Sequence, residues 1–554
     1  MKITINNIPL DLHKGAKVKD AVLKYFSHQG INKPKHLPLV EDRYGNKVAC
    51  DGELTDGNTL FIKTKHRKTS FFPKIVLTVF AIGLLCACST GRKAITSKKG
   101  EKRAIIFAVN DMHATIDNFP KLAYIVDSLQ SIYPEMLLVA AGDNQTGNPV
   151  NDQYPEKGLP MIKLMNAVGF DLSAVGNHEF DSRPEGFSNL THKANFDFIC
   201  ANMSAAEFYN MTVNPYKIIT LPNGLKIAFL GLLHINPNGI PDSHPENVKG
   251  FTFSSPFETA PGYLYLKDQS DIFIALTHLG FENDVQLAET MPAGLDLIIG
   301  GHSHTKVEKE QIHNGILITQ AERKLKYGTL IKLTFNSDGS LQRNMELLDI
   351  KNAKNEKTSI RTMVDKFNDN PALKEVISTA IDDFSSNEEL GYLMADAQRD
   401  AAQADIALVN PGGVRLDHLA KGPITMMNVY QLDPFGNELV LTKLTGHEIQ
   451  ALMFAAYPID ENLPVFPSGI KTILKLDASG NLADVAILTE RGTPLDMNQT
   501  YTVAMNNYMT QVYKYKHSDP GQSLFIATAD ATITYLKKNQ NVRSYRGEKR
   551  IQIN

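Results

Sequence analysis

Metal-ligand residues gather at five places in this 554-residue chain, each directly after a hydrophobic run. Short hydrophobic runs bounded by glycine and polar residues are typical of strands buried on both faces. Side chains just past the carboxyl ends of such strands meet in one crevice of an open α/β sheet. The pattern therefore predicts a single site built from strand ends. The five clusters are Asn110-Asp111-Met112-His113, Gly142-Asp143-Asn144, Gly176-Asn177-His178-Glu179, His278, and Gly301-His302-Ser303-His304.

The residue types in these clusters suit two divalent cations. Imidazole and carboxylate groups bind Zn, Mn, Fe, Co or Mg, and no thiolate is needed. Two cations about 3.5–4 Å apart hold the attacking and leaving oxygens of a phosphate ester and lower the pKa of bound water. Asp111 and His113 lie two apart in an extended stretch and can bind one cation together. Asp143 follows a tight glycine and is the natural bridge between the cations. The remaining ligand candidates are Asn177, His278 and His302 for the second cation and His304 for the first.

The set D-x-H, G-D, G-N-H-E-F-D, T-H-L-G and G-H-S-H resembles the calcineurin-like metallophosphoesterases. The extended G-N-H-E-F-D motif is similar to that of the 5′-nucleotidase and UDP-sugar hydrolase branch. The resemblance implies an α/β fold: a four-layer metallophosphoesterase β-sandwich flanked by helices, followed by an α/β substrate-binding domain. It also implies that His178 stabilises charge on the transferring phosphoryl group or the leaving oxygen, while Asp181 orients its ring. A positioned imidazole is expected to act in this way.

The second half of the chain predicts a substrate domain. ELGYLMADAQRDAAQADIALVNPGGVR has helical periodicity, then a β run and a Gly-Gly turn that presents Asn410 and Arg415 beside backbone N–H groups. Arginine in such a place can clamp an anion. The segment resembles the C-terminal domain of 5′-nucleotidases, which implies that Asn410 and Arg415 contact substrate. The same resemblance places Phe435, in P-F-G-N, and Tyr508, in M-N-N-Y-M, on the two faces of the nucleobase.

Three departures from the family pattern concern this pocket. Tyr508 is followed by MTQVYKYKHSDPGQ and not by the family's G-G-D-G motif. SSNEELGYL lacks the family's upstream Arg and carries Tyr392 in place of Asn. Either the substrate differs, or other residues such as Tyr513, Lys514 or Tyr515 substitute.

Residues 71–90, FFPKIVLTVFAIGLLCACST, form an apolar segment behind a basic run. Its apolar core of about 13–15 residues suits a signal peptide better than a bilayer span of about 20. Leu85-Cys86-Ala87-Cys88 looks like a bacterial lipobox with Cys88 as the lipidated residue. A cleaved lipoprotein and an uncleaved anchor both remain open. Either one implies the bacterial cell envelope, with the catalytic domains outside the cytoplasm.

Residues 1–70 resemble a small β-grasp, ubiquitin-like module, with two strands, a helix and two closing strands around a D-G turn. The module is basic, and positive charge before an apolar segment favours the cytoplasmic side. The expected topology is therefore a cytoplasmic module, a short membrane segment and an exported hydrolase. Alternatively, the native chain starts near the apolar run.

Composition sets the remaining domain limits. Residues 91–103 are a basic tether, 104–350 the metallophosphoesterase domain, 351–375 a charged linker, and 376–554 the 5′-nucleotidase-like domain. The net charge of −3, without a long basic stripe after residue 104, argues against a nucleic acid polymer as partner. Only Cys200 lies beyond the lipobox, so the exported part has no internal disulfide.

These observations predict an envelope-bound, two-metal phosphohydrolase that converts nucleoside 5′-phosphates to nucleoside and phosphate. A UDP-sugar or 2′,3′-cyclic nucleotide hydrolase with the same metals is the alternative enzyme. A nucleotide-binding surface protein with an inactive site is the alternative outside the enzymes. The sequence leaves open the base and sugar preference, the native metals and the oligomeric state.

Overall fold

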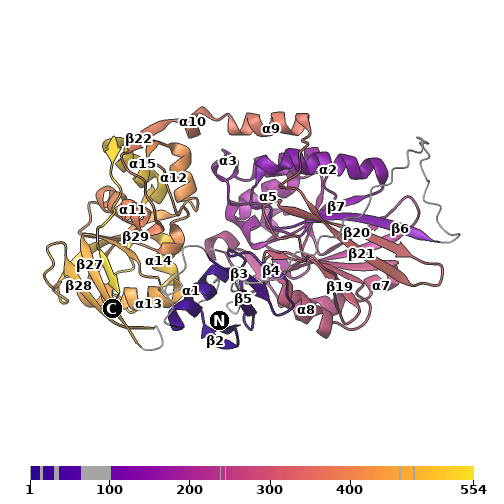
Figure 1. The fold of residues 1–554 in the computed structure, drawn as a ribbon, viewed down its shortest axis with the longest axis horizontal. Coiled ribbons are helices and arrows are strands. Elements are labelled where there is room, and N and C mark those ends of the chain that lie inside the picture. Colours follow the sequence, from indigo (N-terminus) through magenta and orange to yellow (C-terminus); the bar gives the residue numbers. More distant parts are fainter. Residues whose placement is uncertain are drawn as a thin grey trace, which may run out of the picture.

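The computed structural model describes residues 2–12, 17–29, 37–63, 101–236, 239–243, 245–460, 463–477 and 481–553. The expected apolar segment 71–90 and nearly all of the tether lie outside these ranges. Within the ranges, no helix combines the length and the apolar character that crossing a bilayer demands. The described chain forms an N-terminal module, a catalytic domain and a C-terminal domain (Figure 1).

The N-terminal module has a β-grasp-like arrangement of one helix on a mixed sheet. Its strands are ordered β4-β3-β5-β1-β2, with β1 antiparallel to β2 and parallel to β5. Alternate residues of β1 and β5, including Ile3, Ile5 and Leu60, pack on Val18 and Val22 of the helix. The elements are β1 (Lys2–Ile5), β2 (Ile8–Asp11), α1 (Val18–His28), β3 (Leu39–Asp42), β4 (Lys47–Val48) and β5 (Thr59–Lys63).

The sheet of the module continues into the catalytic domain. Strand β17 (Thr305–Lys306) pairs antiparallel with β4, with Thr305 opposite Val48. Figure 1 shows the module, in indigo, against the catalytic domain. The expected topology, with the module in the cytoplasm and the hydrolase outside, is therefore wrong for this arrangement, because a bilayer cannot separate two strands paired in one sheet.

The catalytic domain contains two facing sheets. The first is ordered β11 (Val213–Asn214), β9 (Asp197–Ile199), β8 (Leu172–Ala174), β7 (Leu137–Ala140), β6 (Lys102–Val109), β20 (Tyr327–Phe335) and β21 (Leu341–Asp349). The second is ordered β12 (Tyr216–Thr220), β13 (Lys226–Leu233), β15 (Ile272–His278), β16 (Leu297–Ile299), β19 (Ile316–Thr319) and β18 (Gln311–His313). A separate ribbon pairs β10 (Met203–Ala205) with β14 (Phe251–Phe253).

Three buried layers hold these sheets and their helices together. Ile106 and Phe229 belong to the layer between the sheets, whereas Phe107 points to the opposite face and packs under the helices. This alternation is the two-residue period of a strand buried on both sides. The result is the expected four-layer sandwich. The helices are α2 (Phe119–Ile132), α3 (Pro149–Asp152), α4 (Leu159–Val168) and α5 (Arg183–Lys193) on one side, and α6 (Pro256–Thr259), α7 (Leu266–Gln269) and α8 (Phe281–Thr290) on the other.

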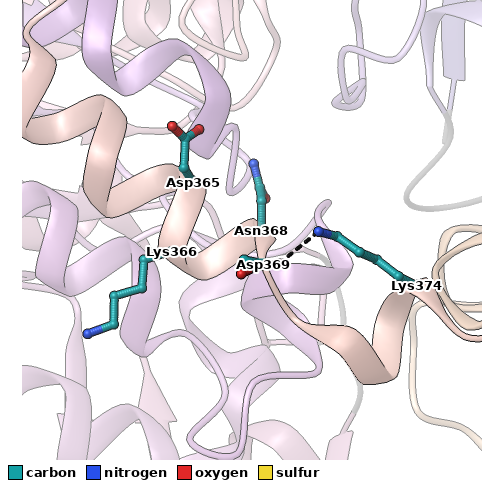
Figure 2. Close-up of a pocket in the computed structure, with 5 residues that line it drawn as sticks. All are labelled: Asp365, Lys366, Asn368, Asp369 and Lys374. Atoms are coloured by element: carbon teal, nitrogen blue, oxygen red, sulfur yellow. Dashed lines mark hydrogen bonds and ion pairs between the residues drawn. The ribbon is translucent and has the colours of Figure 1, made fainter.

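Two helices join the catalytic domain to the C-terminal domain across the top of Figure 1, within the expected linker. Helix α9 (Thr358–Asn368) buries Ile360 and Val364 against the catalytic domain, and α10 (Pro371–Lys374) follows it. Figure 2 shows a hollow at their junction, which is open to solvent and carries an exposed ion pair between Lys374 and Asp369. It holds no buried polar group and lies outside the metal-ligand clusters.

The C-terminal domain contains three small sheets and five helices among the described residues. The central sheet is ordered β26 (Phe466–Ser468), β23 (Ile406–Val409), β29 (Thr500–Asn506), β25 (Glu438–Thr445) and β30 (Gln522–Ala527). The others are β24 (Gly422–Thr425), β22 (Val376–Ala380) and β31 (Asn541–Val542), and β28 (Leu482–Thr489), β27 (Ile470–Leu476) and β32 (Ile551–Ile553). The helices are α11 (Asn387–Ala402), α12 (Met426–Leu432), α13 (Gly446–Ile459), α14 (Asn507–Val512) and α15 (Thr528–Lys538). Met427 and Tyr430 of α12 pack against the catalytic domain.

Candidate metal centre

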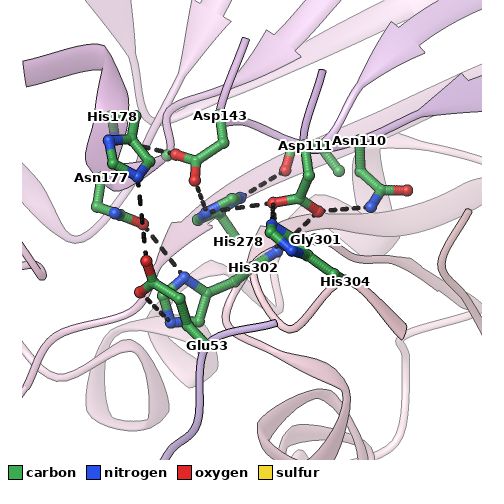
Figure 3. A network of polar contacts seen from close by, with 12 residues as sticks. Glu53, Asn110, Asp111, Asp143, Asn177, His178, His278, Gly301, His302 and His304 are labelled. Carbon is green, nitrogen blue, oxygen red and sulfur yellow. Dashed lines mark hydrogen bonds and ion pairs between the residues drawn. The ribbon is translucent and has the colours of Figure 1, made fainter. Parts of the chain in front are cut away.

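All five ligand clusters lie at strand ends and converge, as Figure 3 shows. Ligand-type atoms of Asp111, His113 and His304 lie within 4.8 Å of one another, and so do those of Asp111, Asp143 and His278. Strands β6, β7 and β8 are parallel neighbours in one sheet, and β15 and β16 are parallel neighbours in the other. Their carboxyl ends therefore meet at one edge of the sandwich, which the sequence pattern predicts.

The His113 and His304 side chains face each other in a way that suits a cation. His113 Nδ1 lies 3.2 Å from the carbonyl oxygen of Thr146, and His304 Nδ1 lies 3.3 Å from Asp51 Oδ1. These oxygens only accept hydrogen bonds, so in a neutral ring the proton lies on Nδ1 and Nε2 is the atom that can bind a cation. The two Nε2 atoms are 2.9 Å apart. A cation between them would relieve the repulsion of the facing lone pairs.

His278 is prepared as a ligand by a backbone carbonyl. Its Nδ1 donates to Ala141 O at 2.8 Å, which directs Nε2 toward Asp143 Oδ2 at 3.2 Å. A hydrogen bond of this kind fixes the tautomer and the ring orientation of a metal-bound histidine. Burial would lower the pKa of His278, but the Asp143 and Asp111 carboxylates outweigh burial and raise it to about 10. This negative environment would equally hold a metal cation.

Asn177 and His302 form another donor pair. His302 Nδ1 lies 3.2 Å from Asn177 Oδ1, which only accepts, so in the neutral ring Nδ1 carries the proton and Nε2 is the atom that can bind a cation. His302 Nε2 is buried and has no hydrogen-bond partner among the described residues. Burial and the neighbouring His234 lower the pKa of His302 well below its usual range. The neutral imidazole is the form that binds metals.

His178 and Asp181 form the expected dyad. His178 Nδ1 lies 2.7 Å from Asp181 Oδ2, and the Thr146 hydroxyl also donates to that oxygen at 2.7 Å. Burial lowers the pKa of His178, but Asp181 and Asp143 reverse the effect and raise it to about 9. The ring therefore carries a positive charge near neutral pH, beside the candidate ligands, where it can stabilise an anionic oxygen.

Glu179, in the same motif, joins two of the loops that carry candidate metal ligands (the metal loops), namely the loop after β7 and the loop after β8. Its carboxylate accepts from the backbone N–H groups of Asp143 at 3.0 Å, Asn144 at 2.8 Å and Gly176 at 2.7 Å. The glycine is required by space, because a Cβ on Gly176 would lie 2.2 Å from Asp143 Oδ1. The loop after β7 is thus held against the loop after β8 at one fixed spacing.

The structure adds two residues that the sequence analysis left out of the site. His234, at the end of β13, and Asp242 form a candidate metal group with His302, and His234 and His302 have ring centroids 5.0 Å apart. The signal for His234 was present, because it follows a hydrophobic run as the other candidates do. Asp242 has no such signal in the sequence.

The expected substrate residues form two groups, Arg415 with Phe435 and Asn410 with the helix that carries Tyr508. The Arg415 guanidinium lies over the Phe435 ring at 5.5 Å from its centroid, and Phe435 is 39% exposed. The buried Asn410 accepts a hydrogen bond from Asn506 Nδ2 at 2.9 Å, at the start of the helix that carries Tyr508. The Tyr508 ring contacts Tyr513 edge-on at 6.3 Å.

The tyrosines near the missing family motifs make contacts within the C-terminal domain. Tyr392 is 1% exposed and donates to Glu388 at 2.6 Å within the core of the C-terminal domain. Tyr513 is 2% exposed, and its hydroxyl is hydrogen-bonded to Asp460. Tyr515 stacks on His517. Since their hydroxyls and rings are engaged internally, Tyr392 and Tyr513 cannot contact a base.

The sandwich and its strand-end donor set define a calcineurin-like phosphoesterase. Residues 105–306 match the calcineurin-like phosphoesterase family, and residues 374–513 match the 5′-nucleotidase C-terminal domain. The chain therefore carries a calcineurin-like phosphoesterase domain followed by a 5′-nucleotidase C-terminal domain, and it is a metal-dependent phosphoester hydrolase.

Several known proteins are similar over most of this chain. The 5′-nucleotidase of Vibrio cholerae serotype O1 is 28% identical over 512 residues, which cover 80% of this chain and 90% of that protein. The trifunctional nucleotide phosphoesterase protein YfkN of Bacillus subtilis is 28% identical over 73% of this chain, which spans only 31% of YfkN. The 5′-nucleotidase precursor from Thermus thermophilus superimposes with a TM-score of 0.66 at 26% identity, covering 82% of this chain and 99% of that one.

Proposed function

We propose that this protein hydrolyses nucleoside 5′-phosphates to nucleoside and phosphate at a site for two divalent cations. Asp143 would bridge the cations, because it belongs to a donor group with His113 and to another with His278. Two such cations would supply an activated water and stabilise the charge of the phosphoryl group. The donor atoms are imidazole nitrogens and carboxylate or amide oxygens, which suit Zn, Mn, Fe or Co.

The chain's own residues would position the phosphoryl group. The imidazolium of His178, held by Asp181, would bind an oxygen of the transferring group. The fixed ring would need no reorganisation as negative charge develops, and one such donor is worth about 10²–10³-fold in rate.

Positively charged side chains from both domains support a nucleotide as the substrate. Burial, Arg323 and Arg415 of the C-terminal domain, whose guanidinium lies over the Phe435 ring, lower the pKa of Lys324 in the catalytic domain to about 8. Lys324 in turn donates its backbone N–H to Asp111 O at 2.7 Å. This arrangement supports the proposal that the Phe435 ring and the Arg415 guanidinium bind a nucleotide on the metal side of the catalytic domain.

The test is phosphate release by the metal-stripped chain after re-supply of Mn, Zn, Mg or Co. The panel holds AMP, UMP, UDP-glucose, 2′,3′-cyclic AMP and bis-p-nitrophenyl phosphate, with His178→Ala as control. Cation-dependent release from AMP and UMP that His178→Ala loses is the expected result. Hydrolysis of the generic diester alone would reject nucleoside 5′-phosphates as the substrate. Faster turnover of UDP-glucose or of the cyclic nucleotide would make that compound the substrate instead.

We also propose that the protein is held at the cell envelope through residues 71–90. The support is the apolar segment with its lipobox-like Leu85-Cys86-Ala87-Cys88. Globomycin-sensitive labelling with a radioactive fatty acid, lost in Cys88→Ser, is expected for a lipoprotein. Labelling that persists in Cys88→Ser would reject lipidation at this residue.

A further inference from the structure

The N-terminal module covers the metal centre. Its sheet pairs with β17, which directly follows His304. Arg43 of the module forms an ion pair of 2.6 Å with Glu282, and Lys47 forms one of 3.0 Å with Glu308. Both matched family regions begin after the module, at residues 105 and 374. The contact is therefore a property of this chain that the family assignment does not explain.

The segment Asp51-Gly52-Glu53 is the part of the module that enters the site. Gly52 lies so close to the metal loop that an added Cβ would be 2.1 Å from the Ser303 carbonyl oxygen. On one side of this glycine, Asp51 contacts His304 Nδ1 at 3.3 Å and forms an ion pair with Arg323. The backbone of the module is thus pressed against the loop that carries two candidate ligands.

On the other side of Gly52, the Glu53 carboxylate points into the donor cluster (Figure 3). Its Oε2 lies 3.7 Å from His302 Nε2, and its Oε1 lies 4.0 Å from His178 Nε2. Glu53 is 7% exposed, and Oε2 has no hydrogen-bond partner among the described residues. Within the module, the Lys17 ammonium lies 3.9 Å from Oε1.

A carboxylate in this position needs a compensating charge. Burying an ionised carboxylate with an unsatisfied oxygen is costly unless a cation or a donor is near. The module offers Lys17 to one oxygen, whereas the second oxygen has no hydrogen-bond partner among the described residues and lies 3.7 Å from His302 Nε2. A bound cation would satisfy that oxygen, since carboxylates are ordinary ligands of Zn, Mn and Mg.

The same position is the one a phosphoryl group must occupy. In the proposed reaction, phosphoryl oxygens lie between His178 and the cations. Glu53 presents two anionic oxygens between His178 and His302, and Asp51 presents another to Arg323. The module and an anionic substrate therefore compete for the same charges.

We propose that the N-terminal module is an autoinhibitory domain whose Glu53 carboxylate occupies the phosphoryl position at the metal centre, so that substrate binds only when the module undocks. This inference rests on the proposed function for the identity of that position. Undocking requires separation of β4 from β17 and of the Arg43–Glu282 pair. Cleavage before Cys88, as in the lipoprotein proposed above, would remove the module and activate the hydrolase, so the autoinhibited state belongs to the uncleaved chain.

The experiment uses the full chain loaded with Co²⁺ and inorganic phosphate as the probe. The visible absorption of Co²⁺ reports its ligands, so a phosphate titration yields an affinity without turnover. Gly52→Ala prevents docking, because the new Cβ meets Ser303 O. Glu53→Gln removes the negative charge at this position and so weakens docking without adding a steric clash. Glu41→Gln is the matched control, since Glu41 pairs with Lys63 within the module at 2.8 Å.

Both Gly52→Ala and Glu53→Gln are expected to bind phosphate about tenfold or more tightly than wild type, because a competing state populated above about 90% lowers apparent affinity tenfold. Glu41→Gln should match wild type. Zero-length carbodiimide crosslinking measures docking itself: the Lys47–Glu308 crosslink should form in wild type, weaken in Glu53→Gln and disappear in Gly52→Ala. The Lys267–Asp296 pair, at 2.5 Å inside the catalytic domain, is the internal control.

Equal phosphate affinity in all four proteins, or a wild type without the Lys47–Glu308 crosslink, would overturn the proposal. The proposed function fails separately. If Gly52→Ala binds phosphate more tightly yet releases none from any nucleotide, the autoinhibitory contact stands and the nucleotidase activity does not. If all four proteins hydrolyse AMP at one rate and bind phosphate equally, the activity stands and the autoinhibition does not.

Discussion

Replacing Gly176 with alanine tests whether the hydrolase depends on the exact spacing of its metal loops. The backbone of Gly176 has a φ of −103°, which alanine adopts without strain, so the effect comes from the side chain alone. The new Cβ would lie 2.2 Å from Asp143 Oδ1 and 2.4 Å from Asp143 N. Relief of that overlap needs a shift of about 1 Å, and a misplacement of this size costs about 10²-fold in rate. Overpacking adds about 1–3 kcal/mol of lost stability.

The assay for Gly176→Ala is kcat/KM on bis-p-nitrophenyl phosphate and AMP, together with metal content after dialysis. We expect kcat/KM to fall about 100-fold, or about 2.7 kcal/mol, and the cations to be lost more readily. Gly262→Ala is the matched control, because nothing lies within 4 Å of its added Cβ. Wild-type activity and metal content in Gly176→Ala would refute the reasoning that Asp143 must hold this position.

Three further predictions concern the cations, the base and the acid stability of the C-terminal domain. Zn²⁺ or Mn²⁺ at about 100 times its Kd should stabilise the metal-free protein by about 2.7 kcal/mol, measured as a rise in Tm; His113→Ala should reduce the rise, and an equal rise in this variant would argue against the site. Phe435→Ala should raise KM for AMP by about 5–150-fold, from about 1–3 kcal/mol of lost stacking, and leave KM for the generic diester unchanged; an unchanged KM for AMP would remove Phe435 from the pocket. Burial would raise the pKa of Asp396, but its bidentate pair with Arg550, at 2.6 and 3.0 Å, lowers it. The stability contributed by Asp396 is therefore present above its unfolded pKa of about 3.9 and lost as pH falls through the lower folded value. In Asp396→Asn, the free energy of unfolding measured with urea should therefore fall less as pH is lowered. The same fall as in wild type would contradict the pairing.

The strand ends of the catalytic domain could be predicted because their signals are local. A buried strand is a short hydrophobic run, and Asp111, Asp143 and His302 each follow one within a few residues. Parallel pairing then brings the carboxyl ends together without any further information. The same local reasoning located the helix and strand that precede Asn410.

The contacts of the module could not be predicted from the sequence. Glu53 and His302 are far apart in the chain, and a single glutamate in an isolated β-bridge carries no signal for the surface that it will meet. Basic charge before an apolar segment gave a topology that the paired strands β4 and β17 exclude. Glu179 shows a second limit: the motif names it, but its three backbone contacts depend on the exact approach of two loops.

The backbone of the metal loops has a consequence for how the protein becomes ordered. Five candidate ligands, Asp111, His113, Asp143, His302 and His304, have φ between 45° and 81°. Such left-handed conformations cost a residue with a side chain roughly 1–2 kcal/mol each, which together approach the net stability of a domain. Cation binding can offset this cost only after the sandwich has formed and has brought the ligand atoms close together. In the metal-free protein, the loops at the carboxyl ends of the strands should consequently exchange their amide hydrogens first. The supply of metal should then decide when the site of the hydrolase becomes ordered.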